Sequence, residues 1–354
     1  MSSTVRHKIG VTKAVQTFYR SALIYLLSSC MAVPGYAAHH DGGFDAGLHE
    51  HVALPGYGDR PYDVFIPGNL SKPAPALLVL HGGGSDASNA IRMTCPGGDV
   101  THLDCITNHA AQNGYIAIFP RGTSRRLLKR VRTWNAGGGD AGNQWICTSG
   151  LACKNNVDEN AYFNALLDAL DASSQVDMKS VYVTGISNGA AMAHRLACEM
   201  PRRIAAIAAV AGANQVSAVQ GCKPDRPVPV LQIHGTADCA WRYSGGVPNC
   251  VGAPRFEGEY IGVERSMRVW RDINGCANEF VATELPDRMD DGTRVTRFDW
   301  RGCQAPLVGY RITDGGHAWP NGYQYLSARR IGRVTRELTN DQIWQFLASH
   351  RLSE

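Results

Sequence analysis

The sequence predicts an α/β fold built on a mostly parallel β-sheet whose two faces are both covered by helices. Short apolar runs recur along the chain, and they are continuous rather than alternating, which is typical of strands buried on both faces. Helical patterns separate these runs, and this alternation favours a parallel sheet. The continuous apolar runs lie at residues 76–80, 115–119, 180–184, 204–210, 228–233 and 307–312.

The helices are predicted from apolar residues at helical spacing and from signals at the helix ends. Pro201 ends one of them, and Gly275 is placed as the stop of another. A capping-box pattern at residues 339–342 starts the last one. The predicted helical segments are residues 158–171, 188–200, 259–274 and about 340–350.

The composition of the 354-residue chain, 44% hydrophobic and 19% charged, is that of a folded globular protein with a large core. No internal repeat and no Pro/Ser/Thr-rich linker divides the chain. We therefore predict one catalytic domain over residues 38–354. Its His-rich start, residues 38–50, is expected to be mobile, and short strands are expected around 50–54 and 61–66.

Residues 1–37 have the pattern of a secretory signal peptide. Four basic residues precede a short apolar run at 22–33, and a small-residue segment follows, with cleavage expected after Ala37. The run is too short to span a bilayer, which takes about 20 apolar residues, so no integral membrane segment is expected after cleavage. The alternative is a bacterial lipoprotein, because residues 27–30 resemble a lipoprotein box that would leave a lipidated Cys30.

The cysteines agree with export to a secreted or periplasmic location. Ten cysteines remain once the leader is removed, and an even number in an exported chain predicts up to five disulfides. No Cys-x-x-Cys pair supports a metal site, so no metal ligand is assigned. The simplest pairing joins neighbours along the chain, namely Cys95–Cys105, Cys147–Cys153, Cys198–Cys222, Cys239–Cys250 and Cys276–Cys303.

The charge of the mature chain gives no reason to expect a nucleic-acid partner. The leader holds four of the 35 basic residues and none of the 31 acidic ones, so its removal leaves equal numbers of each. A near-neutral protein has no general attraction for a polyanion. The glycine-rich stretch at residues 81–84 lacks the patterns that bind phosphate, and no organic cofactor is expected.

The pentapeptide GISNG at residues 185–189 is the strongest chemical signal in the sequence. It follows a predicted strand and precedes a predicted helix, which is the setting of the nucleophile elbow of the α/β-hydrolase fold. Such a turn lifts the serine hydroxyl clear of the sheet. The flanking Gly185 and Gly189 are needed because side chains there would collide with the neighbouring strand and helix. Ser187 is therefore the candidate nucleophile, and an ordinary glycine-flanked turn is the alternative.

A serine hydroxyl needs a positioned base to act as a nucleophile. In this fold the acid follows the serine along the chain, and the histidine follows the acid. His317 lies in a glycine-rich loop after a predicted strand and is the candidate base, whereas His350 is four residues from the C-terminus. Asp238 lies at the carboxyl end of a predicted strand and is the candidate acid. Asp314 is the alternative, although it lies only three positions before His317 and is badly placed to reach the imidazole.

The negative charge that develops on the substrate carbonyl oxygen needs backbone N–H donors that already point at it. Asn188 directly follows the nucleophile and is the first candidate donor. Gly83, in the loop after the first core strand, is the second, with Gly84 as the alternative. His81 and His234 each precede a glycine turn from within the sheet, and we expect both to be packed structural residues.

Four segments in combination resemble the secreted polyhydroxybutyrate depolymerase-like esterases, a group that includes feruloyl and acetylxylan esterases. They are LHGGG, VYVTGISNGAAMAHRLAC, VPVLQIHGTAD and GGHAWP, and the similarity runs from about residue 60 to 350. The resemblance implies a disulfide between Cys198 and Cys222 behind the nucleophile helix. It implies a triad of Ser187, Asp238 and His317. It also implies substrate contacts at Trp134, Asn135 and Trp319, where the aromatic faces of the two tryptophans would hold an acyl chain or phenolic ring.

Two departures from that family bear on the substrate. Cys239 takes the place of the proline that often follows the acid, so a reshaped loop is expected there. The linker and polymer-binding module of extracellular depolymerases are also missing, which argues against attack on crystalline polyester.

The resemblance implies two-step ester hydrolysis through an acyl-enzyme, on short or amorphous hydroxyalkanoate esters. The alternative substrates are feruloyl or acetyl esters on plant polysaccharide. Acyl transfer by the same triad and a non-catalytic binding role are the competing functions.

Overall fold

The computed structural model describes residues 43–353 except 125–130, 139–150 and 252–258. The expected signal peptide, its cleavage site and Cys30 lie outside the described residues. The leader and the lipoprotein alternative therefore stay predictions.

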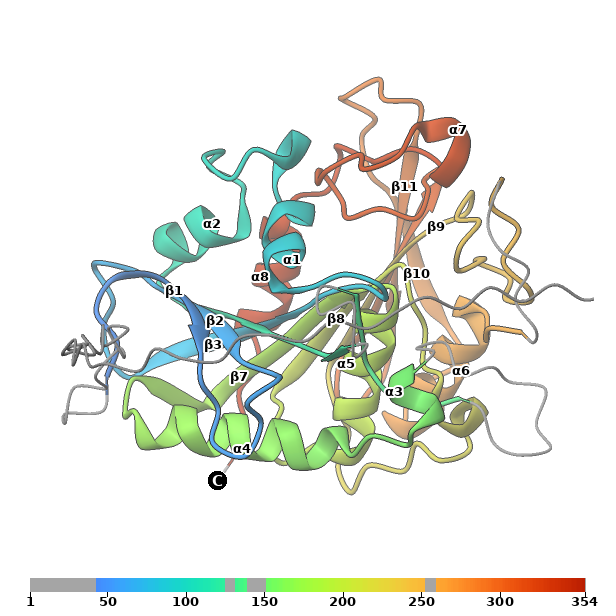
Figure 1. Cartoon of the computed structure of the whole chain (residues 1–354). Helices are drawn as coiled ribbons and strands as arrows, with labels where there is room; N and C mark the ends of the chain where they lie inside the picture. The colour runs from blue at the N-terminus through green and yellow to red at the C-terminus, as the bar shows by residue number, and fades with distance from the viewer. Residues whose placement is uncertain (1–42, 125–130, 139–150, 252–258, 354) are drawn as a thin grey trace, which may run out of the picture. The chain divides into compact units, whose positions relative to one another are not determined.

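A ten-stranded sheet forms the centre of the described chain, in the order β1-β2-β4-β3-β7-β8-β9-β12-β11-β10 (Figure 1). The strands from β4 to β12 in that order pair in parallel, and both edges of the sheet are antiparallel. The bounds are β1 Gly47–Val52, β2 Tyr62–Ile66, β3 Ala74–Leu80, β4 Ile116–Pro120, β7 Val176–Ile186, β8 Ala206–Val210, β9 Val230–Gly235, β10 Phe280–Glu284, β11 Arg294–Trp300 and β12 Leu307–Thr313. A separate short pair joins β5 (Thr123–Ser124) and β6 (Arg132–Thr133).

The parallel strands are buried on both faces, as their continuous apolar runs predict. Along β3, Leu78 and Leu80 belong to one core cluster, whereas Leu77 and Val79 belong to the other. Burying a leucine side chain contributes about 1.5–3 kcal/mol, so both clusters stabilise this strand. The doubly covered α/β sheet of the sequence prediction is confirmed.

In the part of the chain that the structure describes, helices pack on both faces of this sheet (Figure 1). The first face is covered by α4 (Glu159–Ala172), α5 (Asn188–Glu199) and α6 (Val263–Ile273). The second face is covered by α1 (Ala87–Met93), α2 (Ile106–Asn113) and α8 (Asn340–Ala348). The short helices α3 (Leu151–Lys154) and α7 (Ala328–Ile331) and the 3-10 turns Pro96–Gly98 and Val216–Val219 lie in connections.

The helix ends follow the local sequence signals. Thr339 caps α8 and forms the predicted capping box with Gln342, whose side chain accepts the Thr339 N–H at 2.7 Å. Asp158 caps α4 by accepting the N–H of Ala161 at 3.0 Å. The start of α5 has no such side-chain cap, and the helix begins directly after Ser187.

Several elements differ from the sequence prediction, and the helices α1 and α2 are among those that were not predicted. Residues 47–50 were expected to be mobile, but they form the first part of β1 and pair with β2. The antiparallel strands β10 and β11 were not predicted. Most β10 side chains are exposed, so this edge strand carries no apolar pattern that could reveal it.

Four of the five predicted disulfides are confirmed: Cys95–Cys105, Cys198–Cys222, Cys239–Cys250 and Cys276–Cys303. Cys147 lies outside the described residues, so its pairing with Cys153 stays a prediction. Disulfides persist in oxidising compartments, and these four suggest an exported protein. In the part of the chain that the structure describes, every helix is too short or too polar to cross a membrane.

Candidate active site

Ser187 lies in a strained turn between β7 and α5. Its backbone has φ 58° and ψ −120°, in the positive-φ region that non-glycine residues rarely adopt. The Ser187 N–H donates to the carbonyl of Val210 on β8 at 2.9 Å, and the Ser187 carbonyl accepts the N–H of Ala191 at 3.0 Å. The residues on either side are buried while Ser187 itself is partly exposed. This is the geometry of a nucleophile elbow.

The glycines on either side of the elbow are required by close backbone contacts. A Cβ atom on Gly185 would lie 2.7 Å from the carbonyl carbon of Gly189. A Cβ atom on Gly189 would lie 2.4 Å from the carbonyl oxygen of Leu80. Both distances are shorter than real Cβ contacts, so any side chain would push the helix away from the sheet. The reason predicted for these glycines is confirmed.

Asp238 and His317 meet where the neighbouring parallel strands β9 and β12 end. The Nδ1 atom of His317 lies 2.7 Å from Oδ2 of Asp238. The other carboxylate oxygen accepts the N–H groups of Ala240 and Trp241, each at 2.8 Å. The alternative acid, Asp314, is exposed. Its backbone N–H donates to the side-chain hydroxyl of Thr236, the residue that follows β9, at 3.0 Å.

The surroundings of Asp238 favour its ionised form. Burial on its own raises the pKa of this carboxyl, but the charge and hydrogen bond of His317, with the contact of His234, outweigh burial and lower the pKa to about 2. The carboxylate is therefore charged at neutral pH and accepts the Nδ1–H of His317. The Nε2 atom of His317 is then the nitrogen that can take a proton.

The loop 81–84 packs against the start of the nucleophile helix. A Cβ atom on Gly82 would lie 3.6 Å from Cβ of Ser187, and one on Gly83 would lie 3.5 Å from Cβ of Asn188. Asn188 is the first residue of α5, so its N–H has no carbonyl partner within the helix. Its side chain is held by the backbone of Trp134, accepting the N–H at 2.7 Å and donating to the carbonyl at 3.2 Å.

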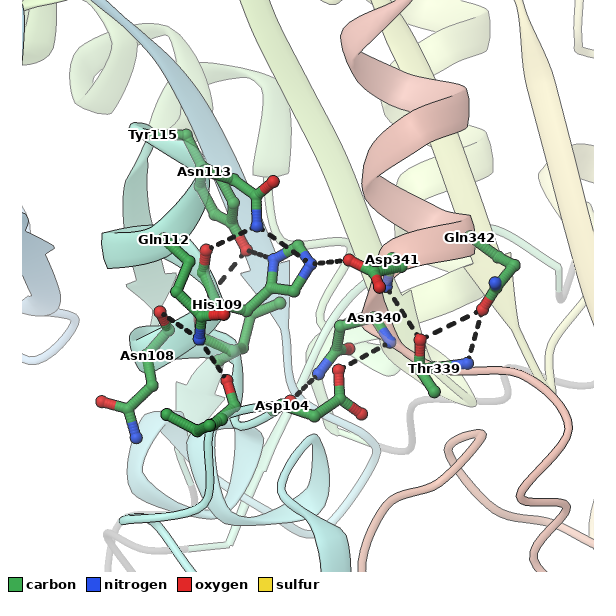
Figure 2. A network of polar contacts seen from close by, with 12 residues as sticks. Asp104, Asn108, His109, Gln112, Asn113, Tyr115, Thr339, Asn340, Asp341 and Gln342 are labelled. Carbon is green, nitrogen blue, oxygen red and sulfur yellow. Dashed lines mark hydrogen bonds and ion pairs between the residues drawn. The ribbon is translucent and has the colours of Figure 1, made fainter. Parts of the chain in front are cut away.

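Asn340 ties the loop that carries His317 to the segment between α1 and α2. Its Oδ1 atom accepts the indole N–H of Trp319 at 2.9 Å. Its Nδ2 atom donates to the carbonyl oxygen of Thr94 at 3.0 Å. The same atom donates to the carbonyl oxygen of Asp104 (Figure 2). The Asp104 carboxylate also accepts a hydrogen bond from Asn321 at 2.8 Å. Sequence reasoning missed this residue, since its only signal was its position in a capped helix.

A second polar link joins α2 to α8 beside Asn340. The Nε2 atom of His109 lies 2.8 Å from Oδ1 of Asp341, and its Nδ1 atom lies 2.9 Å from the hydroxyl of Tyr115 (Figure 2). His109 is buried whereas the Asp341 side chain is largely exposed. Together with Asn340, this contact fixes α8 against the segment that follows the glycine loop.

His81 is a packed structural residue, as predicted. Its Nε2 atom accepts the N–H of Gly122 at 3.0 Å, and burial lowers its pKa to about 4. His234 is also buried, but its Nε2 atom lies 3.2 Å from Oδ2 of Asp238, so it is closer to the site than the sequence indicated. Among the described residues no group of three or more His, Cys, Asp or Glu side chains could hold a metal ion.

The side chains of Trp134, Asn135 and Trp319 differ from the open substrate contacts that were expected. The Trp134 indole is fully buried, lies 4.8 Å from the His81 ring and donates to the His81 carbonyl at 3.0 Å. Trp319 is buried in the second core cluster. The Asn135 amide donates to the Val157 carbonyl at 3.0 Å. The three side chains are therefore buried in the described chain, and the substrate contacts expected of them stay a prediction.

The arrangement defines the class of the protein, which has the α/β-hydrolase fold with a nucleophile elbow. A solved acetyl xylan esterase from Aspergillus awamori shares this fold, with a TM-score of 0.51 and 13% identity over 86% of this chain and 99% of that one. No family model matches the chain.

Two curated relatives carry the comparison further. A probable feruloyl esterase C from Aspergillus niger is 26% identical over 290 residues, which are 81% of this chain and 83% of that protein. Feruloyl esterase B from Piromyces equi is 29% identical over 174 residues, 48% of this chain. The chain spans only about a third of the length of that second relative, 31%. These matches are similarities to feruloyl esterases, and they support the family that the motifs suggest.

The contact between Asp238 and His317 predicts the effect of changing each candidate acid. In Asp238→Asn the amide leaves the imidazole in the wrong tautomer, and we expect kcat for ester hydrolysis to fall about 10⁴-fold. Asp314→Asn is the matched control, because asparagine tolerates the φ of 59° at this exposed position, and it should stay within about twofold of the wild type. Steady-state kinetics on both variants checks this. A larger loss in Asp314→Asn than in Asp238→Asn would reverse the assignment.

Proposed function

We propose that this chain is a serine carboxylic-ester hydrolase that works through an acyl-enzyme. The observation that carries the proposal is the 2.7 Å contact between Nδ1 of His317 and Oδ2 of Asp238, at the edge of the parallel sheet where β7 also ends in the Ser187 elbow. An oriented imidazole with Nε2 able to accept a proton is what a serine hydroxyl needs to become nucleophilic. The esterase names of the relatives support the same reaction class.

In the first half of the reaction, Oγ of Ser187 attacks the ester carbonyl carbon while its proton passes to Nε2 of His317. The tetrahedral intermediate collapses to the acyl-enzyme, and His317 returns the proton to the departing alkoxide, which leaves as the alcohol. In the second half, a water molecule gives its proton to His317 and attacks the acyl-enzyme. The acid is released, and the proton returns to Ser187. Asp238 stabilises the imidazolium in both halves without taking its proton.

The backbone N–H groups of Gly83 and Asn188 are proposed to hold the oxyanion of each tetrahedral intermediate. Their support is the packing of the glycine loop on the start of α5, with 3.5 Å between a Gly83 Cβ position and the Asn188 side chain. Donors fixed before the reaction cost no reorganisation when charge develops, and removing one such donor typically costs about 10²–10³ in kcat.

For the substrate, we propose acyl esters of plant polysaccharide. Two substrate classes were suggested by the sequence, hydroxyalkanoate esters and feruloyl or acetyl esters. The printed names of the relatives, feruloyl esterase and acetylxylan esterase/xylanase, support the second class. Hydroxyalkanoate oligomers remain the alternative.

For the location, we propose a secreted or periplasmic protein that is released by cleavage after Ala37. The four disulfides support export, and the leader pattern supports cleavage. Anchoring through a lipidated Cys30 is the alternative.

The nucleophile assignment predicts a clear difference between the wild type and Ser187→Ala. We expect the wild type to hydrolyse p-nitrophenyl butyrate. The kcat of the variant should be lower by a factor of about 10⁵–10⁶, because no hydroxyl remains to form the acyl-enzyme. Release of p-nitrophenolate measures both rates. Equal rates in the two proteins would end the serine-esterase proposal.

The substrate proposal predicts the ranking of a panel of esters. With methyl ferulate, acetylated xylan and hydroxybutyrate oligomers, we expect the highest kcat/KM on one of the first two, measured by release of free acid. Each assay is repeated with an added alcohol acceptor. A preference for the oligomers would contradict the proposed substrate class, and an excess of transester product over free acid would contradict hydrolysis.

A further inference from the structure

A row of four buried polar side chains leads to Asp238 from the helices α5 and α6, which cover one face of the sheet, and from the strand β9. Each side chain contacts the next one, and all four are almost completely shielded from solvent. In order they are Trp270 on α6, His194 on α5, and Gln232 and His234 on β9.

The first contact sets the tautomer of His194. The indole Nε1 of Trp270 lies 2.9 Å from Nδ1 of His194, and an indole N–H can only donate. Nδ1 of His194 must therefore accept, so its proton sits on Nε2. That Nε2 atom lies 3.0 Å from Oε1 of Gln232, which can only accept.

The orientation of Gln232 then sets the tautomer of His234. Because its oxygen accepts from His194, its amide nitrogen is the atom that donates to the Gly212 carbonyl at 2.9 Å and faces Nδ1 of His234 at 3.4 Å. Nδ1 of His234 therefore accepts, and the His234 proton sits on Nε2. This N–H donates to the Trp241 carbonyl at 2.7 Å, and its nitrogen lies 3.2 Å from Oδ2 of Asp238.

The row points in one direction, from Trp270 to Asp238. Burial lowers the pKa of His194 to about 4, so this ring carries no charge at neutral pH. A protonated His194 ring would donate from both nitrogens and would need two acceptors. Its Nδ1 atom instead faces the indole N–H of Trp270, which is itself a donor. A reversed hydrogen bond anywhere in the row would leave a buried donor facing a donor, which is unfavourable.

We propose that this row makes His234 a positioning residue for the triad, one that keeps the Asp238 carboxylate aligned with His317. The proposal rests on the proposed function, since it concerns the same triad. His234 acts at two places. Its N–H holds the turn 238–241 through the Trp241 carbonyl, and it places a partial positive charge beside the oxygen that Nδ1 of His317 contacts.

The sign of the effect on catalysis follows from the groups around the carboxylate. The titratable groups that face Asp238 are His317, His234 and Tyr325, and those that face His234 are His194, Tyr243 and Asp238. Burial raises the pKa of both tyrosines, so neither titrates near neutral pH. Without the His234 N–H, the negative charge of the Asp238 carboxylate is less compensated. It then attracts a positively charged His317 more strongly, which favours the protonated form of the base.

The test compares His234→Leu, which has no side-chain donor, with His234→Gln, whose amide N–H can replace Nε2–H. A hydrogen bond to a charged group is worth about 10- to 100-fold in rate, so we expect kcat of His234→Leu to fall by that factor with KM little changed. The acid limb of its kcat/KM profile should move to higher pH by about half a unit to one unit. His234→Gln should retain kcat within about threefold and an unmoved limb.

The position of the acid limb does not depend on the concentration of active enzyme, so it separates a smaller folded fraction of His234→Leu from a change at the triad. Wild-type kinetics in His234→Leu would overturn the proposal. So would equal losses in both variants with unmoved acid limbs, because that pattern indicates packing alone.

A second measurement needs no activity. In ¹⁵N-histidine NMR of the full-length wild type, we expect His194 and His234 to be neutral with the proton on Nε2, and a His234 proton on Nδ1 would overturn the proposal. If the wild type hydrolyses no ester, the proposed function fails, while this NMR result still decides whether the row is directed at Asp238.

Discussion

The hydrogen bond between His317 and Asp238 constrains the architecture of the site, because it joins the ends of two neighbouring parallel strands. The 2.7 Å contact requires β9 and β12 to end at the same edge of the sheet and to send their loops toward one another. The carboxyl ends of parallel strands meet at one edge, which is where α/β proteins place their functional groups. The Ser187 elbow after β7 reaches that edge from the same direction.

Each member of the site is held by its own set of buried contacts. The elbow depends on Gly185 and Gly189, where backbone atoms approach too closely for any side chain. The His317 loop depends on Asn340, which links Trp319 to the segment closed by the Cys95–Cys105 disulfide. Buried polar networks of this kind are costly when half satisfied, so they favour a single arrangement of the loops.

The strand core was predictable because it depends on a local signal, since a continuous apolar run marks a strand covered on both faces. Asp238 was favoured over Asp314 because it lies at the carboxyl end of a predicted strand, whereas Asp314 is too close to His317 in sequence to reach its imidazole. The antiparallel strand β10 was missed because its side chains are mostly exposed. The burial of the Trp134 and Trp319 indoles was missed because it depends on partners far away in sequence, His81 and Asn340. The direction of the row that ends at His234 also required the coordinates of four separate side chains.

The central claim is that Ser187 is activated by His317, and covalent labelling tests it most directly. A fluorophosphonate reacts with an activated serine, so mass spectrometry of the labelled wild type should find the phosphonyl group on the peptide that contains Ser187. Labelling of His317→Ala under the same conditions should be slower by several orders of magnitude, because no base removes the hydroxyl proton. A label on another residue, or an equal labelling rate in His317→Ala, would contradict the account.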